Sequence, residues 1–252
     1  MSHAPMLAGR TIVVTGAARG VGLAIAQACA RHGARLVLAD MRIELGQRVA
    51  NELAASGASV RFAGVDLANP DSITAFADSI VAHEGQIDGL VNNAAIATDV
   101  VGKPFEDIDI DLWDKVMAVN VRGTWLMTRA MSPLLQSGGQ IVNLASDTAL
   151  WGPQRLLAYV TSKGAVISMT RSLARELGPR RIGVTAVAPG IMRNEATDYV
   201  PPARHREYED GRAVPGPQMP EDIVDIIAFL LTPAALGMTG QVVPVGNGFV
   251  FV

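Results

Sequence analysis

Short strands rich in β-branched residues alternate with helical segments along this chain of 252 residues, and the alternation limits the folds it can adopt. Residues 10–15 form the first such run, and the helical pattern that follows it ends at Gly33. Strands that alternate with helices predict a parallel sheet covered by helices on both faces. The other strands are expected at residues 35–40, 59–65, 87–91, 139–145, 181–187 and 239–245. The predicted fold class is therefore α/β, with a doubly wound parallel sheet of about seven strands.

One stretch departs from this regular pattern. Residues 191–219 contain four prolines between Pro201 and Pro217, many charged residues and little periodicity. A loop of this length inside a compact domain commonly covers a substrate. Because 49% of the residues are hydrophobic and no linker or repeat interrupts the pattern, we expect a single domain over residues 1–252 with a substrate loop or lid at about 191–219.

The charge and cysteine content exclude several classes of function. Lys and Arg total 21 and Asp and Glu 24, so the net charge of −3 favours neither a nucleic-acid partner nor an anionic membrane. Residues 1–10 lack the apolar core of a signal peptide, no apolar run is long enough to span a bilayer, and Cys29 is the only cysteine. We therefore expect a cytoplasmic protein. The four histidines are scattered, and the sequence predicts no metal site.

A glycine-rich turn joins the first predicted strand to the first helix. It reads Thr15-Gly16-Ala17-Ala18-Arg19-Gly20-Val21-Gly22. Glycines at a strand-to-helix turn let the backbone approach a pyrophosphate, whose charge is favoured at the start of a helix. The turn predicts a dinucleotide site, although a plain strand-to-helix connection would need some of the same glycines.

The second predicted strand ends in Asp40, about 20 residues after the glycines. A carboxylate at this position can accept hydrogen bonds from the ribose hydroxyls of NAD and would repel the additional phosphate of NADP. Arg19 and Arg42 favour the opposite choice, because a guanidinium pairs well with a phosphate. The sequence favours NAD over NADP, and the other interpretation of Asp40 is a helix N-cap.

Two predicted helices carry polar side chains that could take part in catalysis. Tyr159 and Lys163 are four residues apart in a predicted helix over residues 156–177 and share one face. A cation near a phenol lowers the phenol's pKa from about 10, which makes the pair suitable for proton transfer. Asn120 lies inside a second long helix, predicted over residues 111–131, as a tolerated polar side chain or as a kink.

In combination, these motifs resemble those of the short-chain dehydrogenase/reductase family over nearly the whole chain. The resemblance is carried, in order, by the glycine turn, Asp66, Asn92-Asn93-Ala94-Ala95, Asn120, Ser146, Tyr159 with Lys163, and Pro189-Gly190. It implies a Rossmann-like fold and hydride transfer between a nicotinamide and a secondary alcohol or its ketone. The cofactor-binding positions that it implies are Gly16, Arg19, Gly20, Val21, Gly22, Asp40, Asp66, Leu67, Asn93, Ala94, Tyr159, Lys163, Pro189, Gly190 and Ile191.

The resemblance also implies a role for each catalytic residue. Asn120 would hold a water in a proton relay, and Ser146 would hydrogen-bond the substrate oxygen. Tyr159 would transfer the proton, and Lys163 would bind the nicotinamide ribose and lower the pKa of the tyrosine. A homotetramer is implied as well, with the apolar tail at residues 249–252 at or near a subunit contact.

The substrate is less well defined than the chemistry. The candidate substrate-binding residues are Ser146, Tyr159, Ile96, Thr148, Trp151 and Leu156, and Leu150 and the loop around Glu195 to Tyr208 are further candidates for the pocket. An apolar wall around Trp151 favours a cyclic or aromatic alcohol, whereas Asp147 and Glu195 could contact a polyol or sugar. Trp151 could also pack at a subunit contact.

The sequence departs from the family pattern at Ala95 and Asn194, where the family often has Gly and Thr, and at Gly246-Asn247-Gly248, where it often has Asp-Gly-Gly. None of these changes removes a catalytic group, although Asn194 makes the usual contact to the nicotinamide carboxamide uncertain. The alternatives to an NAD-dependent dehydrogenase are an NADPH-dependent ketoreductase, a sugar or polyol dehydrogenase, and a dinucleotide-binding regulator without catalytic activity.

Overall fold

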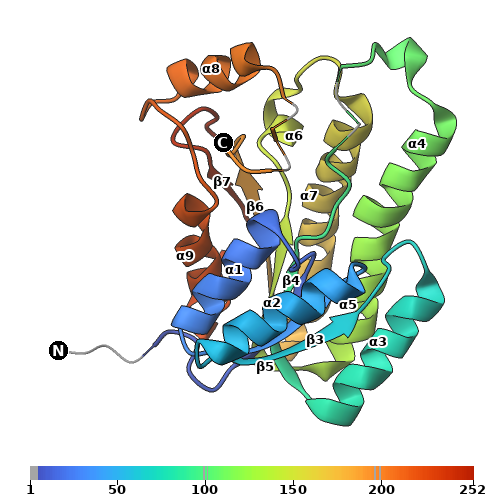
Figure 1. Ribbon diagram of the computed structural model, residues 1–252, viewed down its shortest axis with the longest axis vertical. Coiled ribbons are helices and arrows are strands. Elements are labelled where there is room, and N and C mark those ends of the chain that lie inside the picture. The colour runs from blue at the N-terminus through green and yellow to red at the C-terminus, as the bar shows by residue number, and fades with distance from the viewer. Residues whose placement is uncertain (1–4, 99, 101, 196, 199) are drawn as a thin grey trace.

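The computed structural model describes residues 5–98, 100, 102–195, 197–198 and 200–252. Seven strands form a parallel sheet in the order β3-β2-β1-β4-β5-β6-β7 (Figure 1). The predicted doubly wound sheet is thus confirmed. The strands are β1 (Thr11–Thr15), β2 (Arg35–Asp40), β3 (Ser59–Gly64), β4 (Ile87–Asn92), β5 (Leu135–Leu144), β6 (Gly183–Pro189) and β7 (Val242–Val245).

Helices cover both faces of the sheet (Figure 1). The α-helices are α1 (Gly20–Arg31), α2 (Ile43–Ala55), α3 (Pro70–His83), α4 (Ile110–Val116), α5 (Thr124–Met131), α6 (Thr148–Trp151), α7 (Leu157–Leu177), α8 (Pro202–Gly211) and α9 (Glu221–Leu230). Short 3-10 segments occupy Phe105–Asp107, Ser132–Leu134, Gly178–Arg180 and Pro233–Met238. Within the described residues, every helix is too short or too polar to cross a bilayer.

The core is divided between the two faces because successive side chains of a strand point in opposite directions. Ile12 and Val14 of β1 pack with residues of α1, α2 and α9, whereas Val13 packs with residues of α3, α5 and α7. The central strands are buried on both faces, which explains why their sequences are continuous apolar runs rather than alternating ones.

The position of a ligand follows from the strand order. β1 pairs with β2 on one side and with β4 on the other, so the direction of winding reverses between β1 and β4. In open parallel sheets, ligands bind outside the carboxyl ends of the strands at this switch point. The glycine turn after β1 and residues 93–95 after β4 both lie there.

The helix predicted over residues 111–131 is not continuous. α4 and α5 are separated by a π-helical segment over Met117–Gly123, which contains Asn120. Gly123 is required here, because a Cβ atom on it would lie 2.8 Å from the carbonyl oxygen of Leu67. The kink interpretation of Asn120 is therefore the correct one, and the wide turn is a feature often found at functional sites.

Two helices were not expected. α8 lies within the predicted loop at 191–219, whose residues 196 and 199 fall outside the described residues. α8 contains many charged residues and few apolar ones, so its sequence lacks the apolar periodicity that identifies a helix. α6 is a single turn, too short for any periodicity.

Candidate active site

The glycine turn has the backbone conformation that the sequence predicts. Gly16 and Gly20 have φ values of +66° and +55°, which residues with a side chain rarely adopt. The amide of Gly16 donates to the carbonyl oxygen of Ala39 at 2.7 Å, which ties the turn to β2. A Cβ atom on Gly22 would overlap the carbonyl oxygen of Gly16. The turn is thus packed too closely to accept a side chain at Gly22, and Val21 lies inside it at the start of α1.

Asp40 lies at the tip of β2, next to this turn. One carboxylate oxygen accepts from the amide of Ala18 at 3.1 Å and the other from the amide of Arg42 at 3.0 Å. The N-cap of α2 is Arg42, so the alternative interpretation of Asp40 as the helix N-cap is wrong. Each oxygen retains a lone pair that could accept a hydrogen bond from a ligand.

In the described part of the chain, the side chains of Arg19 and Arg42, unlike the carboxylate of Asp40, are not held against the glycine turn by backbone hydrogen bonds. Nε of Arg19 lies 3.5 Å from Oε1 of Glu195, in an exposed ion pair between the glycine turn and the segment after β6. Arg42 is exposed at the start of α2. The charge of Arg19 is therefore already partly balanced by Glu195.

Thr15 connects the turn to the chain after β4, and sequence analysis did not single it out. Its Oγ1 accepts from the amides of Asn93 at 3.0 Å and Ala94 at 3.1 Å and donates to the carbonyl of Val91 at 3.2 Å. The Asn93 side chain donates to the carbonyl oxygen of Thr15 at 2.9 Å. These bonds hold Asn93 and Ala94 against the glycine turn. The sequence feature that could have predicted this contact is the hydroxyl residue at the end of the buried strand β1.

Asp66 and Leu67 follow β3 at the same edge of the sheet. A carboxylate oxygen of Asp66 accepts from the amide of Ala68 at 2.9 Å, so the side chain shapes its own turn. Leu67 is buried beside Gly123 of the π-helical segment. The two residues border the switch point on the β3 side, where an adenine would lie.

Asn120 is almost fully buried, and its side chain fixes the chain after β4. Its amide oxygen accepts from the amide of Ile96 at 2.7 Å, and its nitrogen donates to the carbonyl of Ile96 and to Oγ of Ser162, both at 3.1 Å. The carbonyl oxygen of Asn120 accepts from Oγ1 of Thr124 at 2.8 Å. Both side-chain N–H donors are used, so a relay water could bond only to a remaining lone pair of the amide oxygen or of this carbonyl.

Lys163 and Tyr159 lie near the start of α7, facing the end of β5. Nζ of Lys163 donates to the carbonyl oxygen of Leu144 at 2.6 Å and lies 5.7 Å from the centre of the Tyr159 ring. Burial lowers the pKa of the lysine to about 8, because the charged form loses its hydration. The ammonium is thus held by the backbone beside the phenol, in the arrangement that the spacing predicts.

Ser146 stands two residues after β5 and is buried. Its Oγ lies 2.9 Å from Oγ1 of Thr148 and 3.3 Å from the amide of Thr148. The hydroxyl of Thr148, a predicted substrate-binding residue, donates to Oγ of Ser146. The next residue, Asp147, is 1% exposed, and burial raises the pKa of its carboxyl to about 7. Asp147 therefore faces the protein interior and not an open substrate pocket.

The candidate substrate residues divide into two groups. Ile96 and Leu156 pack against the same apolar cluster as Tyr159. Trp151 lies in a second cluster, where its ring is 5.9 Å from that of Tyr208 and 5.6 Å from that of Phe249. Tyr208 belongs to the loop expected to line the pocket, and Phe249 to the tail expected at a subunit contact. Their contact with Trp151 was not predicted, because the three residues are distant in sequence.

The segment after β6 is fixed by bonds from several elements. The amide of Asp147 donates to the carbonyl of Pro189 at 3.0 Å, and the amide of Gly190 donates to that of Val245 at 3.2 Å. Arg212 donates to the carbonyl of Ile191 at 2.7 Å. These bonds place Pro189, Gly190 and Ile191 at the carboxyl end of the sheet, next to Asp147.

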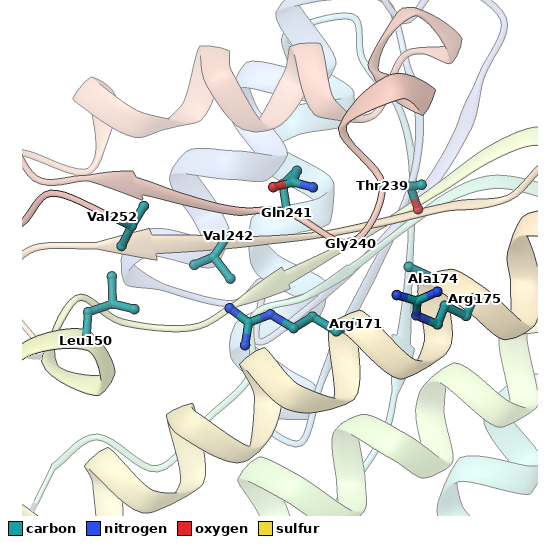
Figure 2. Close-up of a pocket in the computed structure, with 9 residues that line it drawn as sticks. All are labelled: Leu150, Arg171, Ala174, Arg175, Thr239, Gly240, Gln241, Val242 and Val252. Carbon is teal, nitrogen blue, oxygen red and sulfur yellow. The ribbon is translucent and has the colours of Figure 1, made fainter.

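A cavity of about 670 Å³ lies elsewhere, between α7 and β7. Figure 2 shows Arg171 and Arg175 of α7 on one side and Gln241 and Val242 on the other. Leu150, a candidate pocket residue, lines this cavity, whereas the predicted catalytic and cofactor-binding residues do not. The switch point, and not this cavity, brings the predicted catalytic residues together.

Comparison with known proteins agrees with this geometry. A family model described as enoyl-(acyl carrier protein) reductase matches residues 16–250. A 2-(S)-hydroxypropyl-CoM dehydrogenase of Xanthobacter autotrophicus is 35% identical, over 96% of this chain and 97% of its own. The chain belongs to the short-chain dehydrogenase/reductase family.

Other members of this family are similarly close. The cyclopentanol dehydrogenase of a Comamonas species is 33% identical over 95% of this chain and 96% of its own, and the sorbitol dehydrogenase of Cereibacter sphaeroides is 34% identical over 96% and 98%. A dehydrogenase/reductase from Sinorhizobium meliloti has a TM-score of 0.91 at 31% identity, covering 98% of both chains. A short-chain dehydrogenase from Burkholderia cenocepacia in complex with NADP has a TM-score of 0.89 at 30% identity, covering 97% of this chain and 99% of its own.

The glycine turn of this short-chain dehydrogenase/reductase fits the nicotinamide dinucleotide that the family uses. Its positive-φ glycines and the closed contact between Gly22 and Gly16 bring the backbone to the surface at the start of α1. Asp40 and Lys163 would hold the two riboses, and Asn93 supports the wall between them. Among the described residues, no group of three His, Cys, Asp or Glu side chains could hold a metal ion.

Proposed function

We propose that this protein is an NAD-dependent dehydrogenase that interconverts a secondary alcohol and its ketone. The observation that carries the proposal is the buried Lys163 ammonium, anchored on the carbonyl of Leu144 and 5.7 Å from the ring of Tyr159. A phenol next to a fixed cation can give up and regain a proton near neutral pH. The proposal agrees with relatives named as dehydrogenases of alcohols and polyols.

The side chains of this protein would transfer the hydroxyl proton and bind the substrate oxygen. In oxidation Tyr159, as phenolate, takes the proton of the substrate hydroxyl, and in reduction the phenol returns it. Ser146 donates a hydrogen bond to the same oxygen, which orients the substrate and stabilises the charge that develops on it. A bound nicotinamide would supply or accept the hydride. Asn120 holds the backbone of Ile96 in place through two hydrogen bonds.

The apolar surroundings of Tyr159 favour a cyclic or aromatic substrate. Ile96, Leu156 and Val100 pack in the same cluster as the catalytic ring. A polyol would need a carboxylate such as Asp147 or Glu195 to bind its hydroxyl groups. Asp147 is buried and does not face a pocket in which a polyol could bind. The polyol alternative therefore depends on Glu195, which pairs with Arg19.

Asp40 is the main support for NAD over NADP. Its carboxylate is fixed by two backbone amides at the tip of β2, so a phosphate on the adenosine ribose would meet an immobile negative charge. Arg19 is engaged by Glu195, which lowers its value as a phosphate ligand. The NADPH-dependent alternative retains Arg42 as a partner, and the Burkholderia neighbour is in complex with NADP.

Replacing Asp40 by alanine is expected to relax the choice of cofactor. Loss of the carboxylate removes the ribose acceptor and the repulsion of the phosphate, so the ratio of kcat/KM for NAD to that for NADP should fall at least about tenfold, corresponding to roughly 1.4 kcal/mol. The ratio is measured with one alcohol and both cofactors. Asp71→Ala, an exposed acid at the start of α3, is the control. A ratio unchanged by Asp40→Ala would contradict the assignment.

The function itself is tested by turnover. Purified protein is mixed with NAD or NADP and a panel of cyclic alcohols, aromatic alcohols and polyols, and formation of reduced nicotinamide is followed by absorbance. Turnover of ring alcohols with NAD is expected. Turnover of polyols alone, or of any substrate with NADP alone, would replace the proposal by the corresponding alternative.

A homotetramer remains part of the proposal. Large apolar side chains are exposed on and before α4 and α5, among them Phe105, Ile110 and Trp125, and Phe251 and Val252 are exposed at the tail. Such residues commonly mark subunit contacts. Phe249, in contrast, packs inside its own chain against Tyr208. Light scattering should give four times the chain mass, and a monomer would contradict the expectation.

A further inference from the structure

An ion pair connects the substrate loop to the glycine turn. Nε of Arg19 lies 3.5 Å from Oε1 of Glu195, and the two side chains are 40% and 52% exposed. Arg19 directly precedes α1, and Glu195 belongs to the segment after β6. The pair therefore joins the segment expected at the pyrophosphate to the segment expected at the nicotinamide.

Arg19 also lies near the residue that would hold the adenosine ribose. The amide of Ala18, its neighbour in the chain, donates to Oδ2 of Asp40 at 3.1 Å. The long side chain of Arg19 is therefore well placed to reach a phosphate on that ribose, and a guanidinium is a strong partner for phosphate. Among the described residues, the carboxylate that pairs with Arg19 is nevertheless Glu195 and not Asp40. Arg19 is thus directed toward the substrate loop.

The backbone on both sides of Glu195 is fixed by hydrogen bonds. The amide of Arg193 donates to the carbonyl oxygen of Gln218 at 2.8 Å. The amide of Asn194 donates to Oγ1 of Thr197 at 3.2 Å, and the amide of Thr197 donates to the carbonyl oxygen of Asn194 at 2.9 Å. Glu195 is therefore presented to Arg19 from an anchored turn of the substrate loop.

We propose that Glu195 is a specificity-determining residue, which favours NAD by pairing with Arg19 and so withholding its guanidinium from a phosphate on the adenosine ribose. To bind that phosphate, Arg19 would have to leave Glu195, and the carboxylate would lose its partner next to another anion. Asp40 repels the phosphate, and Glu195 neutralises the cation that would attract it. The inference deepens the proposed function and rests on it, because it assigns a second determinant of the same cofactor choice.

Glu195→Gln tests this role, because it removes the charge and keeps the size of the side chain. The probes are adenosine 2′,5′-bisphosphate and 5′-AMP, which carry the ribose with and without the additional phosphate and lack the nicotinamide. Calorimetry gives both Kd values. The Kd for the bisphosphate is expected to fall about threefold, which is the size of effect that one exposed ion pair supplies, and that for 5′-AMP should change less than about 1.5-fold.

Arg19→Gln separates pairing from simple repulsion between Glu195 and the phosphate. In the Arg19→Gln background, Glu195→Gln should change the Kd for the bisphosphate less than about 1.5-fold, because no guanidinium remains to be released. Equal gains in both backgrounds would reduce Glu195 to a repelling charge and overturn the proposal. The same cycle is measured in Asp40→Ala, where removal of the fixed carboxylate strengthens binding of the bisphosphate. Absence of a gain there from Glu195→Gln would also overturn it.

Glu207→Gln is the matched control, because it breaks another exposed ion pair of the substrate loop, that of Glu207 with Arg204. Both Kd values should remain unchanged. A gain equal to that of Glu195→Gln would show that loss of any negative charge in the loop suffices, and would overturn the proposal. None of these measurements needs turnover, so a protein that binds the probes as expected and oxidises no alcohol would contradict the proposed function alone. A protein that does not bind 5′-AMP would contradict the dinucleotide site and both proposals.

Discussion

Tyr159→Phe is expected to reduce kcat by about 10²- to 10⁴-fold while NAD still binds, because it removes the proposed acid-base group and leaves the ring. The ring packs with Ile96, Leu156 and Ala158, and phenylalanine preserves these contacts. Lys163 remains bonded to Leu144, so a ribose contact would survive. The change is measured as steady-state kcat with the best alcohol of the panel and as the Kd for NAD by calorimetry.

The controls for Tyr159→Phe separate chemistry from folding. The midpoint of thermal unfolding should shift little, because a half-buried hydroxyl contributes only modestly to stability. Tyr208→Phe is a second tyrosine-to-phenylalanine change, and any loss in kcat should be at least tenfold smaller, because Tyr208 stacks on Phe249 outside the cluster that contains Tyr159. A Tyr159→Phe protein that keeps more than about a tenth of native kcat would remove Tyr159 from the mechanism.

Gly22→Ala is expected to weaken both the cofactor site and the fold. The added Cβ would overlap the carbonyl oxygen of Gly16 and press on Nδ2 of Asn93. Gly16 is bonded to Ala39 of β2 and the Asn93 side chain to Thr15 of β1, so neither can move without disturbing the turn. We expect a loss of about 1–3 kcal/mol in the free energy of unfolding and at least a tenfold weaker Kd for NAD.

Gly164→Ala is the matched control for this substitution. Gly164 lies inside α7 at an ordinary negative φ, and an added Cβ would meet no atom within 4 Å. Alanine should therefore stabilise the helix by about 0.5–1 kcal/mol. Urea denaturation gives the unfolding free energies and calorimetry the affinities for NAD. If Gly22→Ala matches Gly164→Ala in both measurements, the close contact at Gly22 is not required for the site.

Local patterns were sufficient to predict most of the architecture. Strand and helix periods are properties of neighbouring residues, so β1 to β4 and the helices between them could be located from the sequence. The same holds for Gly16, Gly22, Asp40 and the spacing of Tyr159 and Lys163. The predictions failed for α8, whose polar sequence carries no apolar periodicity and whose position depends on Tyr208 packing against distant residues.

The sequence by itself determined the fold class and the glycine turn and predicted the candidate catalytic side chains, because each depends on patterns of residues close together in the chain. Only the tertiary structure decided which partners those side chains have. Asn120 is fixed by the backbone of Ile96, Asp147 is buried under α8, and Trp151 packs on Tyr208 and not on Tyr159. These contacts join segments 24 to 61 residues apart, and their geometry follows from sheet order and helix packing rather than from local spacing.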